Sequence, residues 1–287
     1  MKENTVEPGV CYLVATPIGN LSDMTYRAVE TLKKVDLIAA EDTRHTKKLL
    51  SAFDIHTPLI SYHEHNEVKR SAELIGQLKQ GKSVALVSDA GMPAISDPGT
   101  VFVEECIEEG IKVSPLPGAN AALTALIASG LSTERFLFFG FLPQNKKEQR
   151  EVWETVEHTR ATCIFYESPH RMVKTLKQME KALGDRQMAF ARELTKKYEE
   201  IFRGSISRAI IHLEEKEIKG EFVLLIEGGG KERGTLFDQM NIEEHVNYYR
   251  KQGLSKKESM KKVASDRNIS KNQIYAQIMI KDKEPTD

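Results

Sequence analysis

The chain has 287 residues, with 41 lysines and arginines against 42 aspartates and glutamates, so its formal net charge is −1. This balance excludes a global basic field for nucleic-acid binding, and a hydrophobic content of 40% is enough to bury ordinary cores. The sequence contains no apolar run of the roughly 18 to 20 residues that a membrane span needs, and its first ten residues lack the apolar stretch of a signal peptide, so we expect a cytoplasmic protein.

Strand and helix patterns alternate through the first part of the chain. We expect strands at 10–16, 36–40, 58–61, 84–88 and 113–116, and helices at 26–35, 43–53, 67–79, 99–109 and 119–128. Such βα alternation predicts a largely parallel sheet covered by helices on both faces.

A second block of alternating elements follows. We expect strands at 136–139, 162–166, 187–192, 199–203 and 222–226, with helices at 146–158, 169–183 and 206–214. Pro169 suits the first turn of its helix. The predicted fold class is therefore α/β, with two α/β domains at 1–130 and 131–229.

The last part, 230–287, is predicted to be a linker and a helical appendage. Gly228, Gly229 and Gly230 introduce the linker, and helices are expected at 242–252, 256–267 and 270–279, with Ser270 as an N-cap. The last two helices fit a helix-turn-helix unit, and lysines and arginines cluster here. A small bundle used only for packing, with a solvated basic face, fits the same pattern.

The three cysteines are Cys11, Cys106 and Cys163. They are far apart and lie in apolar segments, which is typical of reduced, buried thiols and not of a disulfide framework or a zinc site.

Residues 76–83, GQLKQGKS, match the phosphate-loop pattern letter for letter. A working phosphate loop leaves a strand and opens a helix, whereas this segment ends a predicted helix and precedes a strand. We expect a plain connection at the edge of the sheet opposite the site.

Charged and glycine-containing motifs follow the predicted strands, at the edge where open α/β sheets bind ligands. The most informative is SDAGMPAISDPG at 88–99, in which a buried strand delivers a carboxylate into a tight loop stiffened by Pro93. The first strand ends in ATPIGNL, which lacks the G-x-G-x-x-G fingerprint of dinucleotide sites.

The second and third strands end in AEDTRHT and SYHEHN. An N-cap explains one residue of the first motif but not its four charged or titratable ones, which favours a functional cluster. An isolated His-x-His is a poor metal signal, so no metal is expected. Similar motifs follow three later strands: PLPGANA, FYESPHR and ARELTKKYEE.

Six motifs follow one another along the chain: ATPIGNLSDMTYRA, AEDTRHTKKLL, SDAGMPAISDPG, PLPGANA, FYESPHR and ARELTKKYEE. Taken in this order, they resemble the tetrapyrrole methylase (class III) family, and within it the branch that methylates small-subunit ribosomal RNA. The resemblance covers nearly the whole chain. It implies a fold with S-adenosylmethionine bound in a cleft between two α/β domains, transfer of its methyl group to the ribose 2′-oxygen of a decoding-centre cytidine in 16S rRNA, and a homodimer. The helical appendage would then dock on RNA or the small ribosomal subunit.

Carried over by position, the resemblance implies a set of cofactor-binding residues: Pro17, Ile18, Gly19, Asp89, Gly91, Met92, Pro93, Asn120, Ala121, Tyr166 and Ser168. Tetrapyrrole methylases often have a glycine-rich first loop and a Gly-Asp-Pro turn. This chain has Thr-Pro-Ile-Gly and Ser-Asp-Ala-Gly instead, which fits the rRNA branch and argues against a porphyrin substrate.

Methyl transfer from a sulfonium to a hydroxyl needs in-line positioning and benefits from a base and a dry cleft. Candidate bases or hydroxyl-orienting groups are Glu41, Asp42, His63, Glu64 and Glu193. Candidate phosphate contacts are Arg44, Lys47, Lys48, Arg171, Arg192 and Lys196.

Two alternatives remain open. One is a class III methyltransferase of a small molecule such as a tetrapyrrole, or of diphthamide. The other is a non-enzymatic RNA-binding regulator with a vestigial cleft.

Overall fold

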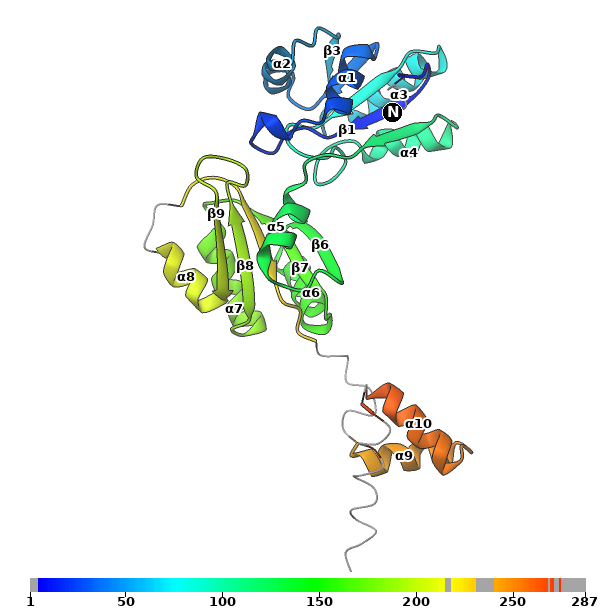
Figure 1. The fold of residues 1–287 in the computed structure, drawn as a ribbon, viewed down its shortest axis with the longest axis vertical. Helices are drawn as coiled ribbons and strands as arrows, with labels where there is room; N and C mark the ends of the chain where they lie inside the picture. Colours follow the sequence, from blue (N-terminus) through cyan, green and yellow to red (C-terminus); the bar gives the residue numbers. More distant parts are fainter. Residues whose placement is uncertain (1–4, 215–217, 231–239, 268, 271–273, 275–287) are drawn as a thin grey trace, which may run out of the picture. The chain divides into compact units, whose positions relative to one another are not determined.

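A computed structural model describes residues 5–214, 218–230, 240–267, 269, 270 and 274. The chain divides into two compact units, Met1–Gly229 and Gly230–Asp287. The first unit contains two five-stranded sheets (Figure 1). Every strand and helix predicted between residues 10 and 226 is present, and the observed ends differ from the predicted ones by no more than three residues.

The first sheet is entirely parallel, as predicted, in the order β3-β2-β4-β1-β5. Its strands are β1 (Cys11–Val14), β2 (Leu37–Ala40), β3 (Leu59–Ser61), β4 (Val84–Val87) and β5 (Val113–Leu116). They alternate with α1 (Tyr26–Lys34), α2 (Thr43–Ala52), α3 (Glu67–Lys79) and α4 (Thr100–Glu108), and a short 3₁₀ helix, η1 (Leu21–Asp23), precedes α1.

The strands of this sheet are buried on both faces because successive side chains point to opposite sides. In β1, Tyr12 and Val14 pack with α1 and α2, through residues such as Leu32. Cys11 packs with α3 and α4, beside Phe102. The apolar runs in the sequence are therefore central strands of a three-layer sandwich, and their carboxyl ends meet at one edge.

The second sheet is mixed, in the order β6-β7-β10-β8-β9. Its strands are β6 (Phe136–Phe141), β7 (Thr162–Glu167), β8 (Gln187–Arg192), β9 (Glu200–Ser205) and β10 (Phe222–Ile226). Only β6 and β7 pair in parallel, and the other neighbouring pairs are antiparallel. Its helices are α5 (Ala121–Ser129), α6 (Lys146–His158), α7 (Met172–Leu183) and α8 (Ile206–Glu214).

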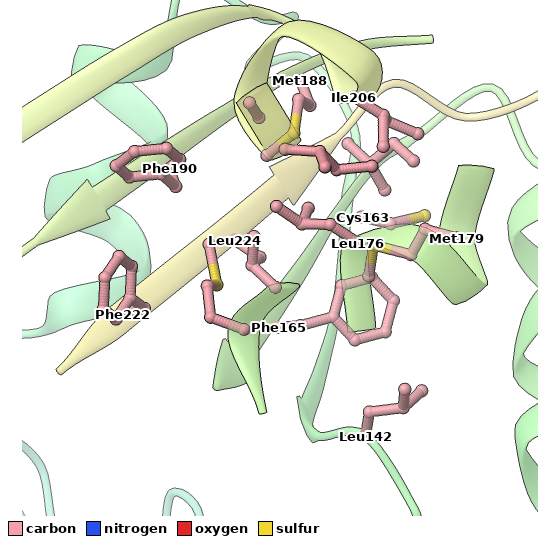
Figure 2. Close-up of a cluster of buried hydrophobic side chains, with 14 of the residues drawn as sticks. Leu142, Cys163, Phe165, Leu176, Met179, Met188, Phe190, Ile206, Phe222 and Leu224 are labelled. Carbon is pink, nitrogen blue, oxygen red and sulfur yellow. The ribbon is translucent and has the colours of Figure 1, made fainter. Parts of the chain in front are cut away.

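The main core of the second sheet lies between the strands and α6, α7 and α8. Figure 2 shows Phe165, Phe190, Phe222 and Leu176 among its fully or almost fully buried side chains. The opposite face packs on α5, and Ile18 from the first sheet's loop joins that second cluster. A continuous apolar contact thus ties the two sheets of the first unit together.

Two local features differ from the sequence prediction. Strand β6 continues past 139 to Phe141 through an irregularity at Gly140, whose φ of 65° explains the glycine. Helix α7 begins at Met172 and not at Pro169, because Ser168 to Arg171 form a turn in which the Ser168 carbonyl accepts from Arg171 N.

The segment GQLKQGKS connects the end of a helix to a strand, as the sequence predicted. Gly76 is inside α3, and β4 begins directly after Ser83. The Ser83 backbone N–H and hydroxyl both donate to a carboxylate oxygen of Asp36, at 2.7 Å each. Ser83 therefore serves the connection between α3 and β4.

In the second unit, α9 (Ile242–Lys251) and α10 (Lys256–Asp266) both begin with a capping box, formed by Asn241 with Glu244 and by Ser255 with Glu258. They pack through a small core that contains Val246, Tyr249, Met260 and Val263. Apart from Ser270 and Ile274, the helix predicted at 270–279 lies outside the described residues.

Gly228 and Gly229, which we predicted to begin a linker, pack closely against the backbone at the end of α6. A β-carbon on Gly228 would lie 2.3 Å from the Thr159 carbonyl oxygen, and Gly229 N donates to the Val156 carbonyl at 2.8 Å. These two glycines allow close approach of two backbones, and the first unit ends with them.

All three cysteines are buried and free, as predicted. In the part of the chain that the structure describes, no helix is both long and apolar enough to cross a membrane. Over the same residues, no group of three or more histidine, cysteine, aspartate or glutamate side chains is arranged to hold a metal ion.

Candidate active site

The loops that follow β1 and β4 are joined at the carboxyl edge of the first sheet. Thr16 and Gly91 exchange two backbone hydrogen bonds, of 2.8 and 3.0 Å, as an isolated antiparallel bridge. The Thr16 hydroxyl also donates to the Ser88 carbonyl, at 3.1 Å. The two motifs singled out in the sequence therefore form one structural block.

A cavity of about 350 Å³ lies between this block and the second sheet. This volume is within the usual range for small-molecule and cofactor sites. Its walls come from the loops after β1, β4 and β5 and from the ends of β6, β7, β8 and β10: Ile18, Ala90, Gly91, Met92, Ile95, Ser96, Asp97, Asn120, Ala121, Phe141, Tyr166, Glu167, Ser168, Pro169, Ala191, Leu194, Gly220, Glu221, Phe222 and Val223.

Backbone strain is concentrated at this cavity. Five non-glycine residues in the described part of the chain have positive φ, and four of them form two alternating pairs: Ala94 with Ser96, and Glu193 with Thr195. The residue between each pair, Ile95 or Leu194, lines the cavity. Such conformations cost free energy and persist where the surroundings impose them, often at functional sites.

Three carboxylates gather near the first-sheet wall of the cavity. Asp89 Oδ1 accepts a hydrogen bond from Asp42 N at 3.1 Å, which joins the ends of β4 and β2. Burial and the neighbouring charge of Asp89 raise the pKa of Glu41. Burial, followed by the charge of Glu41, raises the pKa of Asp97 to about 6.

The opposite wall is formed by the end of β7. The Tyr166 ring packs edge-on against Phe138 and Phe141, with centroids 5.0 and 5.7 Å away, and burial raises the pKa of its hydroxyl. The buried Glu167 carboxylate accepts from Ser168 N at 2.8 Å and from the Thr175 hydroxyl at 2.6 Å. These partners hold the end of β7, which carries the lining residues Tyr166 and Glu167, in place.

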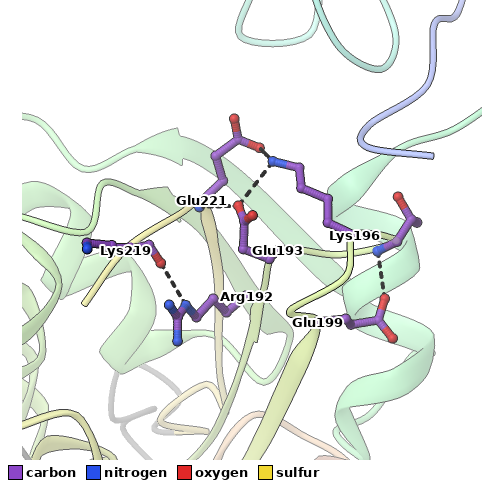
Figure 3. A network of polar contacts seen from close by, with 7 residues as sticks. Arg192, Glu193, Lys196, Glu199, Lys219 and Glu221 are labelled. Carbon is purple, nitrogen blue, oxygen red and sulfur yellow. Dashed lines mark hydrogen bonds and ion pairs between the residues drawn. The ribbon is translucent and has the colours of Figure 1, made fainter. Parts of the chain in front are cut away.

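A polar network lies at the end of β8 and the start of β10, and its member Glu221 lines the cavity (Figure 3). Lys196 Nζ lies 3.0 Å from a carboxylate oxygen of Glu193 and 3.0 Å from one of Glu221. Glu193 also accepts from Glu221 N at 3.1 Å, and its hydrogen bonds and Lys196 lower its pKa even though burial opposes them. Its side chain covers Gly220, where a β-carbon would lie 2.5 Å from Glu193 Cγ.

The structure brings seven of the eleven predicted cofactor-binding residues into the wall of the cavity: Ile18, Gly91, Met92, Asn120, Ala121, Tyr166 and Ser168. The other four, Pro17, Gly19, Asp89 and Pro93, belong to the same loops but are not among the lining residues.

None of the five predicted base or hydroxyl-orienting residues lines the cavity. Glu41 lies close enough to Asp97 and Asp89 for their charges to interact. The Asp42 carboxylate caps α2 and pairs with Arg44 at 2.9 Å. Both His63 and Glu64 follow β3, where a side-chain nitrogen of Asn66 lies 3.1 Å from His63 Nε2.

The predicted phosphate contacts fall into two groups. Arg44, Lys47 and Lys48 are exposed on α2, where Arg44 pairs with Asp42. The others are held by partners from other elements: Arg171 donates to the Leu142 carbonyl, Arg192 donates to the Lys219 carbonyl, and Lys196 belongs to the network of Figure 3.

Sequence reasoning missed several lining residues. It did not select Asp97 or Ile95, although both lie in the quoted SDAGMPAISDPG motif, and Asp97 precedes a Pro-Gly turn that directs the chain into α4. It also did not select Glu167, Leu194 or the start of β10. These residues could be placed in the cavity wall only once the strand directions of the second sheet were known.

Comparison with known proteins gives a consistent picture. The family model of Tetrapyrrole (Corrin/Porphyrin) Methylases matches residues 10–210. Two proteins named Ribosomal RNA small subunit methyltransferase I are similar over almost the full length: one from Halalkalibacterium halodurans, 54% identical over 94% of each chain, and one from Bacillus subtilis, 52% identical over 95% of each chain.

Solved structures share the fold at low sequence identity. Uroporphyrin-III-C-methyltransferase from Thermus thermophilus has a TM-score of 0.55 at 19% identity, covering 77% of this chain and 95% of its own. A diphthine synthase has a TM-score of 0.58 at 15% identity, covering 76% and 90%. The alignment to the Halalkalibacterium halodurans relative spans 272 residues, more than the first unit contains, so it extends into the second unit.

Proposed function

The chain belongs to the tetrapyrrole methylase family, and on this premise we propose that it is an S-adenosylmethionine-dependent methyltransferase of small-subunit ribosomal RNA. The observation that carries the proposal is the extension of the 54% identity beyond the two-sheet unit and into the helical unit. The two-sheet unit is common to methylases of several substrates, whereas the helical unit is shared with relatives named for ribosomal RNA.

The residues of the cavity fit S-adenosylmethionine. Gly91, with φ 81°, lies in the cavity wall and lets a ligand come close to the backbone, and Gly118 lets the loop after β5 pack on Ala15 at the end of β1. Thr195, next to the lining residue Leu194, has a buried hydroxyl with no hydrogen-bond partner among the described residues.

We propose that the seven lining residues from the predicted set hold the cofactor, and that Pro17, Gly19, Asp89 and Pro93 fix their loops. When bound, S-adenosylmethionine supplies a methyl group on a positively charged sulfur. The cavity wall is largely apolar, with Ile18, Met92, Leu194 and Phe222 in it, and this keeps water away from the reacting centre.

The acceptor is proposed to be the ribose 2′-hydroxyl of a decoding-centre cytidine in 16S rRNA. We propose that Arg44, Lys47 and Lys48, exposed together on α2, contact the phosphates. Arg171, Arg192 and Lys196 lie near the cavity and are held by protein partners, which suits them to fixed contacts with the nucleotide that enters.

None of the five predicted base or hydroxyl-orienting residues lines the cavity, and their contacts support positioning roles. The contacts of Glu193 with Lys196 and Glu221 support the loop that carries Leu194. Glu41 and Asp42 stand beside the Asp89 carboxylate, and His63 and Glu64 lie in the neighbouring loop.

A homodimer is also proposed. Leu123 and Ile127, one turn apart on α5, are 45% and 78% exposed, which is unusual for paired large apolar side chains and suits burial by a second copy. Light scattering should give a dimer that Ile127→Asp weakens, with Ile211→Asp on the exposed face of α8 as the control. A wild-type monomer would refute this part of the proposal.

The test of the function uses small ribosomal subunits from cells that lack this activity. Incubation with methyl-labelled S-adenosylmethionine should label 16S rRNA, and mapping should place the label on a 2′-oxygen of a decoding-centre cytidine. Label on a base, or none on subunits but transfer to a tetrapyrrole, would contradict the proposal. Because its substrate is ribosomal, the protein is expected to act in the cytoplasm.

A further inference from the structure

Three carboxylates line the cavity, and two of them are committed to partners. Glu167 is buried against Ser168, Thr175 and Arg171, and Glu221 pairs with Lys196. Asp97 is the third. Among the described residues it forms no ion pair with a lysine, arginine or histidine, and the nearby Ser88 side chain lowers its pKa without outweighing burial.

The loop around Asp97 holds this side chain in a fixed place. Ser96, directly before it, has φ 62°, and Gly99, two residues after it, has φ 144°. A β-carbon on Gly99 would lie 2.8 Å from Leu86 Cδ2 and 3.2 Å from Ala94 Cβ, so the loop folds tightly back over the end of β4. Such packing fixes the backbone on both sides of Asp97, which lines the cavity.

The surroundings of Asp97 suit a group that accepts a proton near neutral pH. Glu41 from the end of β2 and Asp89 from the end of β4 face it from the first sheet, and Tyr166 from β7 faces it across the cavity. None of these neighbours is a cation, so burial and the charges of Glu41 and Asp89 raise the pKa of Asp97 although Ser88 lowers it. A base that titrates near the working pH is the most effective kind.

We propose that Asp97 is the general base of the methyl transfer. This inference rests on the proposed function, because it assigns the proton acceptor for the ribose hydroxyl. As the hydroxyl oxygen bonds to the methyl carbon, the carbon–sulfur bond breaks and its electron pair stays on sulfur. The hydroxyl proton passes to a carboxylate oxygen of Asp97 and then to solvent, so charge and atoms balance.

The variant Asp97→Asn keeps the shape of the side chain and removes the base. It should lower kcat by about 100-fold or more and leave KM for the subunits within about twofold. The wild-type kcat should rise with pH through a midpoint near 6, the pKa of Asp97, and level off above it, and the variant should lose this rise. A kcat within about threefold of wild type in Asp97→Asn would overturn the proposal.

Binding measurements separate a base from a counter-charge to the sulfonium. A base predicts that Asp97→Asn changes the Kd of S-adenosylmethionine and of S-adenosylhomocysteine by the same small factor. A selective loss for S-adenosylmethionine, which alone carries the positive sulfur, would make Asp97 its electrostatic partner and overturn the proposal. This readout needs no turnover.

The matched control is Asp54→Asn. Asp54 also has a positive φ, 53°, but its side chain is 83% exposed and contacts only His56 among the described residues, so activity should stay within about twofold. If Asp97→Asn does not fold, the wild-type pH profile still decides, since a kcat that is flat from pH 5 to 8 overturns the proposal. A wild-type protein that transfers no methyl group to subunits would instead refute the proposed function.

Discussion

A β-carbon placed on Gly19 would lie 2.5 Å from Lys196 Cγ and 3.0 Å from the Leu194 carbonyl oxygen. Gly19 follows β1 in the first sheet, and Leu194 and Lys196 follow β8 in the second. The two loops therefore touch beside the cavity at a point where only a hydrogen fits. This contact helps to set the distance between the cavity's walls.

Gly19→Ala should push these two loops apart. We expect the affinity for S-adenosylmethionine to fall about tenfold, which corresponds to about 1.4 kcal/mol, while the protein remains folded. Isothermal titration calorimetry measures this directly. Gly76→Ala is the control: a β-carbon there meets nothing within 4 Å, and in the interior of α3 alanine should stabilise the helix by about 0.5–1 kcal/mol. Equal affinities for Gly19→Ala and wild type would show that the contact is not tight.

Glu167→Gln should destabilise the first unit. The buried carboxylate accepts two hydrogen bonds and lies 3.3 Å from Arg171 Nε, and an amide replaces one acceptor oxygen with a donor. We expect the free energy of unfolding to drop by about 2–3 kcal/mol, measured by urea denaturation. Glu214→Gln, which removes an exposed pair with Lys177, should cost no more than about 0.5 kcal/mol. Similar losses for both variants would be the contrary result.

Glu41→Gln should move the pH dependence of the reaction. The Glu41 charge helps to raise the pKa of Asp97, so its removal lowers that pKa and shifts the rise of kcat toward lower pH. The midpoint of the kcat profile is the measurement, and the shift is expected even if the maximal rate also changes. An unchanged or higher midpoint would show that Glu41 does not act on the titrating group.

Asp97→Asn should stabilise the protein at high pH. The folded pKa of Asp97 is about 6 and its ordinary value is 3.8, so the folded state binds more protons than the unfolded state between these values. Stability is therefore lost as pH rises through this window and stays reduced above it. Thermal unfolding should give a Tm a few degrees above wild type at pH 8 and little difference at pH 4. A lower Tm at pH 8 would contradict the assignment of the shift.

Removal of residues 230–287 should separate the two binding activities. The first unit ends at Gly229, with its own cores intact, so we expect cofactor affinity within about twofold of wild type. Binding to small subunits should weaken about tenfold or more and depend less on salt, because the lysines and arginines of α9 and α10 are lost. Loss of cofactor binding would instead assign the second unit a structural role.

The elements of the fold could be predicted almost completely, because apolar runs and helical periodicity are local properties of the sequence. The direction of the strands in the second sheet could not. The short connection between β8 and β9 fits the antiparallel pairing observed there, but the antiparallel pairing of β10 with β7 and β8 is set by tertiary contacts. The start of α7 was misplaced because Pro169 fits a first helical turn as well as the turn that precedes the helix.

The candidate site could be predicted where strand ends mark it, as for Gly91 and Tyr166. Asp97 could not, since it lies ten residues beyond the end of β4 and reaches the cavity only because the intervening loop folds back. Glu193 follows a strand, which is why the sequence pattern selected it. Its carboxylate forms an ion pair with Lys196 and accepts a hydrogen bond from the Glu221 backbone amide, and it does not line the cavity.

The alternating left-handed residues on either side of Ile95 and Leu194 have a thermodynamic consequence. Their conformations are unfavourable whether or not a ligand is present, so this free-energy cost falls on the folding equilibrium. The loops are then already in shape when a ligand arrives, and binding loses less conformational entropy than it would if it had to order them. These conformations thereby lower the free energy of unfolding, and the cavity is correspondingly preorganised.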